Sequence, residues 1–233
     1  MQIKNTKDVS NTHLSYLIFG NSKTGKTRLS TTTPPNETLL INVENNLASI
    51  CGAGVNFADA TTWAEFMEAL LWLENASKDQ LPKWIVIDSI TELVKVLLRL
   101  EISIAKDPRQ AYGEIGVKIP DVIRRLKALP INLVCLAQQG YIKDDVGGEM
   151  HFGAAMDGKQ LSQSLPYMFD AVLATRAMEH DGELHYVIQC RPTNQYDNIG
   201  IRTSFTADKG AISEYELPNL LNLHNKIIAH EAS

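Results

Sequence analysis

The fold of this chain is decided by the stretch Gly20-Asn21-Ser22-Lys23-Thr24-Gly25-Lys26-Thr27, which fits the pattern G-x-x-x-x-G-K-[ST]. An apolar run at 14–19 precedes it and predicts a buried strand, and the residues after it can open a helix until Pro34-Pro35. Between a strand and a helix, this pattern cradles phosphate oxygens with backbone N–H groups. The sequence therefore predicts that all eight residues of the loop bind a nucleotide, ATP.

Four residues of the loop have predicted roles of their own. Lys26 reaches the β- and γ-phosphates, and Thr27 offers its hydroxyl to Mg²⁺. Gly20 and Gly25 permit backbone conformations that a side chain would block. The alternative is a glycine-containing turn with an accidental lysine, and the flanking strand and helix favour the nucleotide site over it.

Composition sets the class of protein. The chain has 233 residues, 44% hydrophobic and 21% charged, which predicts one domain at 1–233, with a core at about 14–205 and a C-terminal extension at 206–233. A net charge of −5 argues against a strongly basic nucleic-acid binder and leaves room for a local basic groove. The three cysteines are far apart and favour buried free thiols. We expect a cytoplasmic protein without membrane contact, because neither a signal-peptide core nor a spanning apolar run is found.

Strands and helices alternate along the chain. This order predicts a doubly wound, mainly parallel α/β sheet with helices on both faces and antiparallel C-terminal hairpins. Residues 103–118 are expected to be a loop or an irregular helix start before a helix opened by Pro120, and 140–158 a long mobile loop. The expected strands are 38–43, 83–88, 131–137, 170–176 and 184–190, with 199–205 at the sheet edge, and further helices are expected at 62–73, 89–100, 159–168 and 220–228.

Polar residues at the strand ends are site candidates, because ligands bind beyond the carboxyl ends of such strands. Asp88 can hold Mg²⁺, or else it is only a charge at the start of a helix. Glu44 can orient or deprotonate the attacking water, or else it is a solvated loop acid. Gln138 can contact the γ-phosphate and report its presence to the following loop, and Gln139 is a rival for that role.

The glycine loop and the three strand ends that follow it, taken in their order along the chain, resemble the RecA-type ATPase core. The glycine loop is followed by Leu40-Ile41-Asn42-Val43-Glu44, by Ile85-Val86-Ile87-Asp88-Ser89 and by Cys135-Leu136-Ala137-Gln138. The chain looks most similar to the short phage-encoded RecA-core ATPases, which include single-strand annealing recombinases. Val43-Glu44-Asn45-Asn46-Leu47 and the stretch at 157–170 add to this resemblance, which covers about 14–205.

The resemblance implies an ATPase that acts on single-stranded DNA in strand annealing or exchange, in the host cytosol if the chain is phage-encoded. It implies a homo-oligomer, a ring or filament, in which a neighbouring subunit inserts a cation at the γ-phosphate. Only Arg202 carries that role over, because Gly200 stands where the family has a lysine. A single-strand-binding protein is a further partner that the resemblance admits. The resemblance also implies that two segments bind DNA, 103–118 and 140–158. They combine cations for the phosphate backbone with rings for base stacking, and the candidates are Lys106, Arg109, Tyr112, Lys118, Tyr141, Lys143, His151 and Phe152.

Two other classes of function stay open. A P-loop small-molecule kinase needs a substrate pocket and lid arginines, for which Arg124-Arg125 is the candidate pair. A nucleotide-dependent assembly or switch protein needs no DNA and is favoured if Glu44 does not reach the water.

Overall fold

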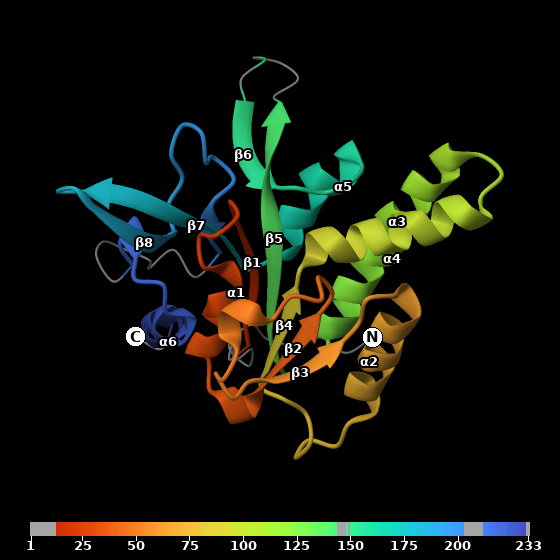
Figure 1. Cartoon of the computed structure of the whole chain (residues 1–233), viewed down its shortest axis with the longest axis horizontal. Helices are drawn as coiled ribbons and strands as arrows, with labels where there is room; N and C mark the ends of the chain where they lie inside the picture. Colours follow the sequence, from red (N-terminus) through yellow and green to blue (C-terminus); the bar gives the residue numbers. More distant parts are fainter. Residues whose placement is uncertain (1–12, 144–147, 149, 203–211, 232–233) are drawn as a thin grey trace, which may run out of the picture.

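A ten-stranded sheet forms the centre of the molecule (Figure 1). The computed structural model describes residues 13–143, 148, 150–202 and 212–231. The main path of the sheet runs β10-β8-β7-β1-β5-β4-β2-β3, with β6 paired to β5 and β9 paired to β7. From β7 to β3 the neighbours are parallel, whereas β6, β8, β9 and β10 pair antiparallel. The strands are β1 (Ser15–Gly20), β2 (Thr38–Asn42), β3 (Asn56–Asp59), β4 (Trp84–Asp88), β5 (Asn132–Lys143), β6 (Met150–Ala154), β7 (Ala171–His180), β8 (Glu183–Gln189), β9 (Gly200–Ile201) and β10 (Tyr215–Glu216).

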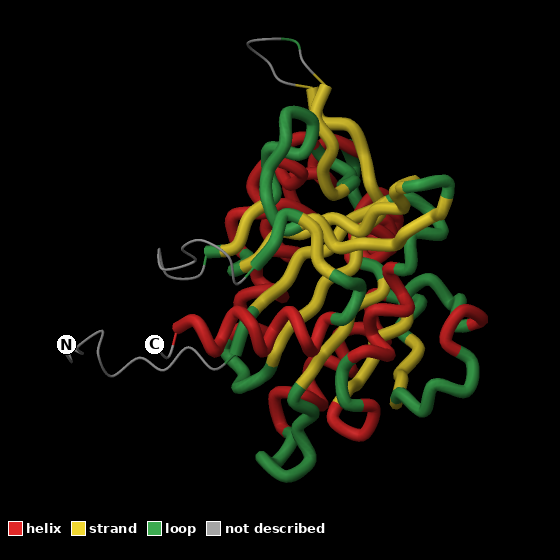
Figure 2. Tube along the Cα trace, turned by 90° about the vertical axis from the view of Figure 1, so that its left-hand side faces the viewer, coloured by secondary structure: helices red, strands yellow, loops and turns green. Residues whose placement is uncertain are grey.

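Helices cover both faces of the sheet, so the predicted fold class is confirmed. Figure 2, seen from the side of α6, shows this helix lying across the strands. The helices are α1 (Lys26–Leu29), α2 (Trp63–Asn75), α3 (Ile90–Ile104), α4 (Pro108–Lys127), α5 (Lys159–Ser164) and α6 (Leu220–Glu231), with the short 3₁₀ turns η2 (Ser30–Thr32), η3 (Pro35–Glu37), η4 (Ala48–Ile50) and η5 (Leu165–Met168).

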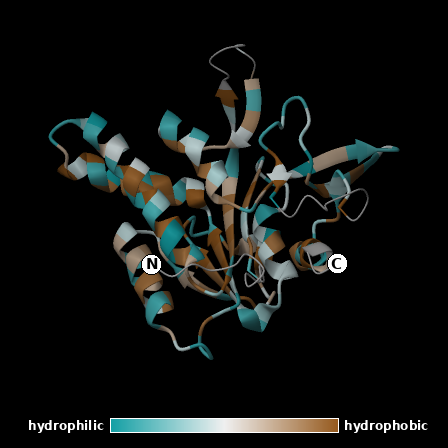
Figure 3. Ribbon diagram, turned by 180° about the vertical axis from the view of Figure 1, so that it is seen from behind, coloured by the Kyte–Doolittle hydropathy of each residue, from teal (hydrophilic) through white to brown (hydrophobic). Residues whose placement is uncertain are grey.

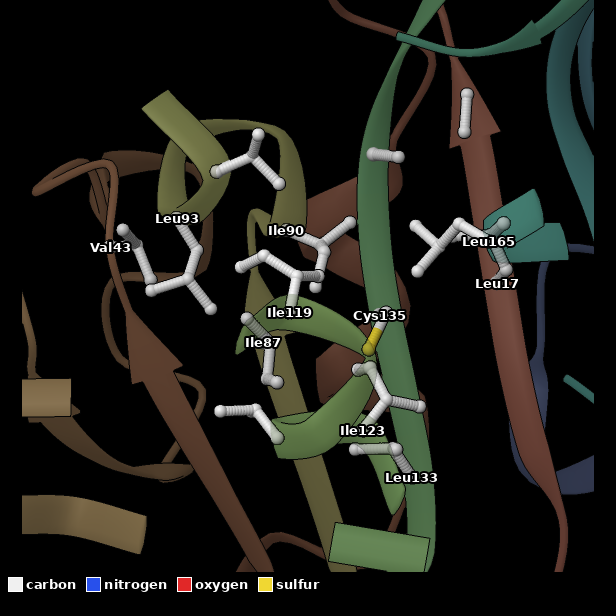
Figure 4. Close-up of a cluster of buried hydrophobic side chains, with 14 of the residues drawn as sticks. Leu17, Val43, Ile87, Ile90, Leu93, Ile119, Ile123, Leu133, Cys135 and Leu165 are labelled. Carbon is white, nitrogen blue, oxygen red and sulfur yellow. The ribbon is translucent and has the colours of Figure 1, made fainter. Parts of the chain in front are cut away.

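Alternation along the central strands divides the core into two layers. Successive strand residues face opposite sides of a sheet, so Leu17 packs with α2 to α5 and Ile18 packs with α1 and α6. Figure 4 shows the first layer, where Ile87 and Cys135 of the sheet meet Ile123 of α4. Burial of its thiol raises the pKa of Cys135 far above the usual range, which keeps this thiol unreactive. Hydrophobic colouring follows the central strands in Figure 3, whereas the tip of the β7–β8 hairpin is hydrophilic.

Two expectations about the loops are wrong. Most of 103–118 is helical, because α3 continues to Ile104 and α4 begins at Pro108, where the Asp107 carboxylate caps it by accepting from the Arg109 N–H. Pro120 accordingly lies inside α4 and does not open a helix. In place of a long loop at 140–158, β5 extends to Lys143 and pairs with β6, and the intervening 144–147 and 149 lie outside the described residues.

Other expectations on the C-terminal half are confirmed. The β7–β8 hairpin turns at Asp181 and Gly182, which both have positive φ. The expected edge strand is short, since β9 covers only Gly200–Ile201 and 203–205 are not described. Over the described part of the chain, none of the helices combines the length and hydropathy needed to cross a membrane.

A buried histidine ties the last helix to the sheet. His224 of α6 shares a hydrogen bond of 2.7 Å with the Tyr16 hydroxyl, and its ring meets the Trp84 ring edge-on at 4.8 Å between centroids. Burial is the main cause that lowers the pKa of His224 from 6.5 to about 4, and the nearby His13 adds to it. The folded protein therefore holds this imidazole neutral where the unfolded chain would protonate it.

We predict that this histidine makes the protein sensitive to acid. Between pH 6.5 and 4 the unfolded chain binds a proton at His224 that the folded chain does not. The contribution of His224 to the free energy of unfolding is therefore complete above pH 6.5, and it falls by up to about 3 kcal/mol toward pH 4. Urea unfolding at pH 7.5 and 4.5 measures the free energy of unfolding of wild type and variants. His224→Gln should be less stable than wild type at pH 7.5, and the gap should narrow at pH 4.5. The exposed His185→Gln is the control, and an unchanged gap for His224→Gln would contradict this account.

Candidate active site

Parallel register brings the predicted residues to one edge of the sheet. Gly20, the last residue of β1, pairs with Gln138 on one side and with Thr175 on the other. Asp88, the last residue of β4, pairs with Asn42 of β2. Glu44 follows two residues after Asn42, and its backbone N–H donates to the Asp88 carbonyl at 3.2 Å. The glycine loop, both carboxylates and the glutamine therefore form one site.

Each loop glycine is needed for a different reason. A Cβ on Gly20 would lie 2.1 Å from the Thr175 hydroxyl and 2.7 Å from its carbonyl oxygen, so only glycine fits beside β7. Gly25 has φ 87°, a left-handed conformation that ordinary residues avoid. The Thr24 and Thr175 hydroxyls share a hydrogen bond of 2.7 Å, which fastens the loop to the sheet. This loop is therefore held in shape by the fold.

Lys26 lies inside the loop. Its ammonium donates to the Gly20 carbonyl at 2.9 Å and to the Asn21 carbonyl at 2.7 Å. Burial lowers the pKa of Lys26, and the nearby Asp88 and Glu44 carboxylates oppose that shift. Phosphate oxygens are stronger acceptors for an ammonium than neutral carbonyls are. The lysine is therefore placed to exchange its loop carbonyls for a nucleotide's phosphates.

Thr27 and Asp88 have the oxygen ligands that suit Mg²⁺. The Thr27 hydroxyl donates to the Asp88 carboxylate at 2.6 Å, and only 5% of Asp88 is exposed. Burial raises the pKa of Asp88 from 3.8 to about 6, against the opposing hydrogen bond from Thr27. Among the described residues, no cluster of three or more His, Cys, Asp or Glu could hold a metal alone. A nucleotide-bound Mg²⁺ fits, because this ion takes few protein oxygens and completes its shell with phosphates and water.

Glu44 is exposed at the same edge and is held from two sides. The Ser89 hydroxyl donates to its carboxylate at 2.5 Å, and the Gln138 amide approaches the same oxygen at 3.4 Å. Ser89 is also the N-cap of α3 and accepts from the Glu92 N–H. These contacts fix a carboxylate near Lys26 of the loop, and a fixed carboxylate is what the orientation of an attacking water requires.

Gln138 joins the site to the β5–β6 hairpin. Its backbone N–H donates to the Thr91 hydroxyl at 3.0 Å, and the Thr91 hydroxyl in turn donates to the Ala155 carbonyl at 2.9 Å. The Ala155 N–H donates back to the Gln138 carbonyl at 2.7 Å. Gln139, the rival candidate, instead accepts from the Tyr196 hydroxyl at 3.3 Å. Gln138 is therefore the glutamine that contacts Glu44.

Three of the four cations proposed for DNA contact lie on the α3–α4 hairpin, and ion pairs neutralise two of them. Arg109 forms an ion pair with Asp107 at 2.7 Å, and Lys118 binds the buried Glu101 at 2.7 Å. Lys106 is exposed at the turn between the two helices. The helical hairpin therefore presents less free positive charge than its sequence indicates.

The aromatic candidates differ in their exposure. Tyr141 is 70% exposed on β5, whereas Phe152 packs between Tyr141 and Tyr196, with ring centroids 5.1 and 4.7 Å away. Tyr112 is 47% exposed and lies beside Gly158, so the two candidate segments meet there. The His151 ring nitrogen lies 3.4 Å from the Asp197 carboxylate, and the Lys143 side chain is outside the described part.

Arg202 lies at the opposite edge of the sheet from the loop. Its guanidinium donates to the Tyr167 carbonyl and its N–H to the Asp170 carbonyl, both at 2.6 Å. Asp170 is anchored to Ser15 at the start of β1, and the five steps from there to Gly20 span about 16 Å. Arg202 is therefore not part of the site in its own chain.

Sequence reasoning missed three supporting hydroxyls. The sequence places Ser89 only at the start of the expected helix 89–100, yet its hydroxyl also holds Glu44. Thr91 and Thr175 gave no signal, because a threonine in a helix or strand is common and only the register shows what it contacts.

Comparison with known proteins identifies the domain. Residues 12–198 match a family model described as an AAA domain. The chain belongs to this family. The AAA domain match confirms the P-loop ATPase part of the sequence interpretation, whereas a phage origin and a recombinase type stay predictions. A search of curated proteins found no match.

Solved structures include similar folds. One is a KaiC-like protein from the hyperthermophilic archaeon Pyrococcus horikoshii OT3, with 13% identity and a TM-score of 0.47 over 78% of this chain and 80% of that one. The assignment of this AAA domain rests on its own loop and sheet, together with the family match.

We predict that the two carboxylates act at different steps. Asp88→Asn should weaken Mg²⁺-dependent ATP binding, because it removes the charged oxygen beside Thr27. Glu44→Gln should bind ATP normally and slow hydrolysis by about 10²–10⁴-fold, the usual contribution of a general base. Calorimetric binding and phosphate release measure the two steps separately.

The control for this pair is Glu37→Gln, which changes a carboxylate at the other edge of the sheet. Normal hydrolysis by Glu44→Gln would show that the base lies elsewhere. Equal loss of binding in both variants would contradict the separation of roles.

Proposed function

We propose that this AAA domain hydrolyses ATP with Mg²⁺ and acts on single-stranded DNA in strand annealing or exchange. In hydrolysis, Glu44 takes a proton from a water molecule while the oxygen of that water bonds to the γ-phosphorus. The bond from that phosphorus to the β–γ bridging oxygen breaks, which yields ADP and phosphate. Lys26 balances the phosphate charge, and Thr27 with Asp88 would hold the Mg²⁺, which stabilises the charge that develops on the phosphates.

One observation carries the link to a second ligand. Gln138 contacts Glu44 with its side chain, and β5 runs on from Gln138 to the exposed Tyr141 within a few residues. A γ-phosphate that attracts the Gln138 amide would pull on the same strand that carries Tyr141. Occupation of the ATP site is thereby coupled to the β5–β6 hairpin, the prominent extension in Figure 1.

Single-stranded DNA is supported as the second ligand more by the ring available for base stacking than by the positive charge available for phosphates. Tyr141 offers an open ring, and base stacking is worth roughly 1–3 kcal/mol per base on any sequence. The ion pairs of Arg109 and Lys118 leave few cations to neutralise phosphates. Binding should therefore be weak, independent of sequence and only shallowly dependent on salt.

The kinase alternative is less well supported. Arg125 binds Glu74 of α2 through two hydrogen bonds of 2.7 Å, and the helix that carries it ends where β5 begins. Arg124 lies in the same turn, so the candidate lid arginines are at the amino end of the strands, away from the phosphates. The switch alternative is decided by the DNA experiment.

We predict that single-stranded DNA binds, and more tightly with a non-hydrolysable ATP analogue. Fluorescence anisotropy of labelled single-stranded and duplex oligonucleotides, across a salt series, measures this. Tyr141→Ala should weaken binding by roughly 5- to 100-fold, because it removes the stacking ring. Tyr167→Ala, an exposed tyrosine at the other edge, should not.

Two outcomes would count against the DNA proposal. An absence of binding in every nucleotide state would favour the switch protein. Equal affinity with and without the ATP analogue would contradict coupling through Gln138.

We also propose head-to-tail assembly. Arg202 is too far from its own phosphates, so it can reach a γ-phosphate only in a neighbouring copy, and a head-to-tail contact repeats into rings or filaments. A single-strand-binding protein is a further partner consistent with this role.

Arg202→Ala should lower turnover more than ATP binding, and turnover per subunit should rise with protein concentration. Steady-state kinetics over a dilution series tests both. The control is Arg191→Ala, which also removes a guanidinium bound to a backbone carbonyl. Full activity of a strict monomer would exclude a role in trans.

A further inference from the structure

We propose that the base of the nucleotide binds in a cavity beside the glycine loop and stacks on Tyr186, a residue of the β7–β8 hairpin. The inference rests on the proposed function, because it assigns the remaining part of a nucleotide whose phosphates occupy the loop. The ligand is a nucleoside triphosphate, and the cavity recognises the flat heteroaromatic ring of its base.

The cavity is continuous with the loop. It measures about 380 Å³, within the range of small-molecule sites, and is lined by loop residues 23–25 together with Arg28, Thr32, Tyr186 and Pro218. A larger cavity of about 800 Å³ lies beside Glu37 and Lys83, at the amino ends of the strands, and so cannot hold a nucleotide anchored at the loop.

The order of the strands sets the direction of the nucleotide. Asp88 ends β4 and Glu44 follows β2, and both strands lie on one side of β1. Since these carboxylates mark the γ-phosphate end, the nucleoside must extend from the loop away from them. On the other side of β1 lie β7 and β8, which carry the cavity wall.

Register places the Tyr186 ring on the correct face. Tyr186 pairs with Ala177, and Ile188 pairs with Thr175, the residue that holds Thr24 of the loop. Residues two apart along a strand share a face, so Tyr186 and Ile188 both face the layer that contains α1. The hairpin extends past the end of β1 and stands beside the loop.

A hydrogen bond and strand pairing hold the walls of the cavity in place. The Leu220 N–H donates to the Thr32 hydroxyl at 2.9 Å, which joins the segment after α1 to α6 next to Pro218. On the opposite wall, β8 is fixed between β7 and β10. Tyr186 remains 45% exposed, so its ring is available, and the flat Arg28 guanidinium from α1 can lie against a base as a cation–π partner.

The test separates the base from the phosphates. Calorimetry compares Mg²⁺–ATP with Mg²⁺–tripolyphosphate, which has the phosphates and no base, on wild type, Tyr186→Ala and Tyr186→Phe. Tyr186→Ala should lose roughly 5- to 100-fold in ATP affinity and keep its tripolyphosphate affinity. Tyr186→Phe retains the ring and should bind ATP like wild type. Leu184→Ala, exposed on the same strand and face, is the matched control.

Three results would overturn the base site. The first is wild-type ATP affinity in Tyr186→Ala, and the second is an equal loss of ATP and tripolyphosphate, which would place the effect on the loop. The third is an equal loss in Leu184→Ala. Failure of wild type to bind either ligand would instead overturn the nucleotide site of the proposed function. Thermal unfolding of each variant shows that the fold is intact.

Discussion

The parallel pairing of β1 with its neighbours is the constraint on which the site depends. In parallel strands the carboxyl ends meet at one edge, so residues separated by more than a hundred positions become neighbours there. The pairing of Gly20 with Gln138 and of Asp88 with Asn42 fixes which residues these are. A slip by one residue would turn each strand's buried side chains to the opposite layer, and the two-layered core forbids it. The stability of the core therefore sets the accuracy of the site.

Electrostatics at this edge explain why the site suits a metal-bound nucleotide. Asp88 is nearly buried, and burial and Glu44 both raise its pKa, to about 6 overall. Near neutral pH the protein thus holds a carboxylate that its surroundings compensate only through Thr27 and Lys26. The Lys26 ammonium in turn donates hydrogen bonds to two loop carbonyls. A Mg²⁺–nucleotide would satisfy both groups at once, because it brings a cation to the carboxylate and anions to the ammonium.

The sequence predicted the elements whose signal is local, and missed those set by long-range contacts. The glycine loop and the apolar strands are visible because phosphate cradles and buried strands restrict residue types. The strand β3 was missed since its residues are mostly exposed, and only its pairing with β2 makes it a strand. Pro120 and the glycines near it suggested a break, but packing of α4 against α3 and the sheet overrides that propensity. The support of Glu44 by Ser89 and the wall formed by Tyr186 depend on register, which no single segment reveals.

Every other assignment at this site depends on the proposed contact between Lys26 and the phosphates of ATP. The direct measurement is ATP affinity and turnover of Lys26→Ala beside Lys83→Ala, a lysine at the other end of the sheet. Lys26→Ala should lose most of its affinity or turnover and keep its unfolding temperature, because the phosphate charge is left uncompensated in a formed loop. Lys83→Ala should behave like wild type. Unchanged binding and turnover in Lys26→Ala would contradict the assignment of the loop.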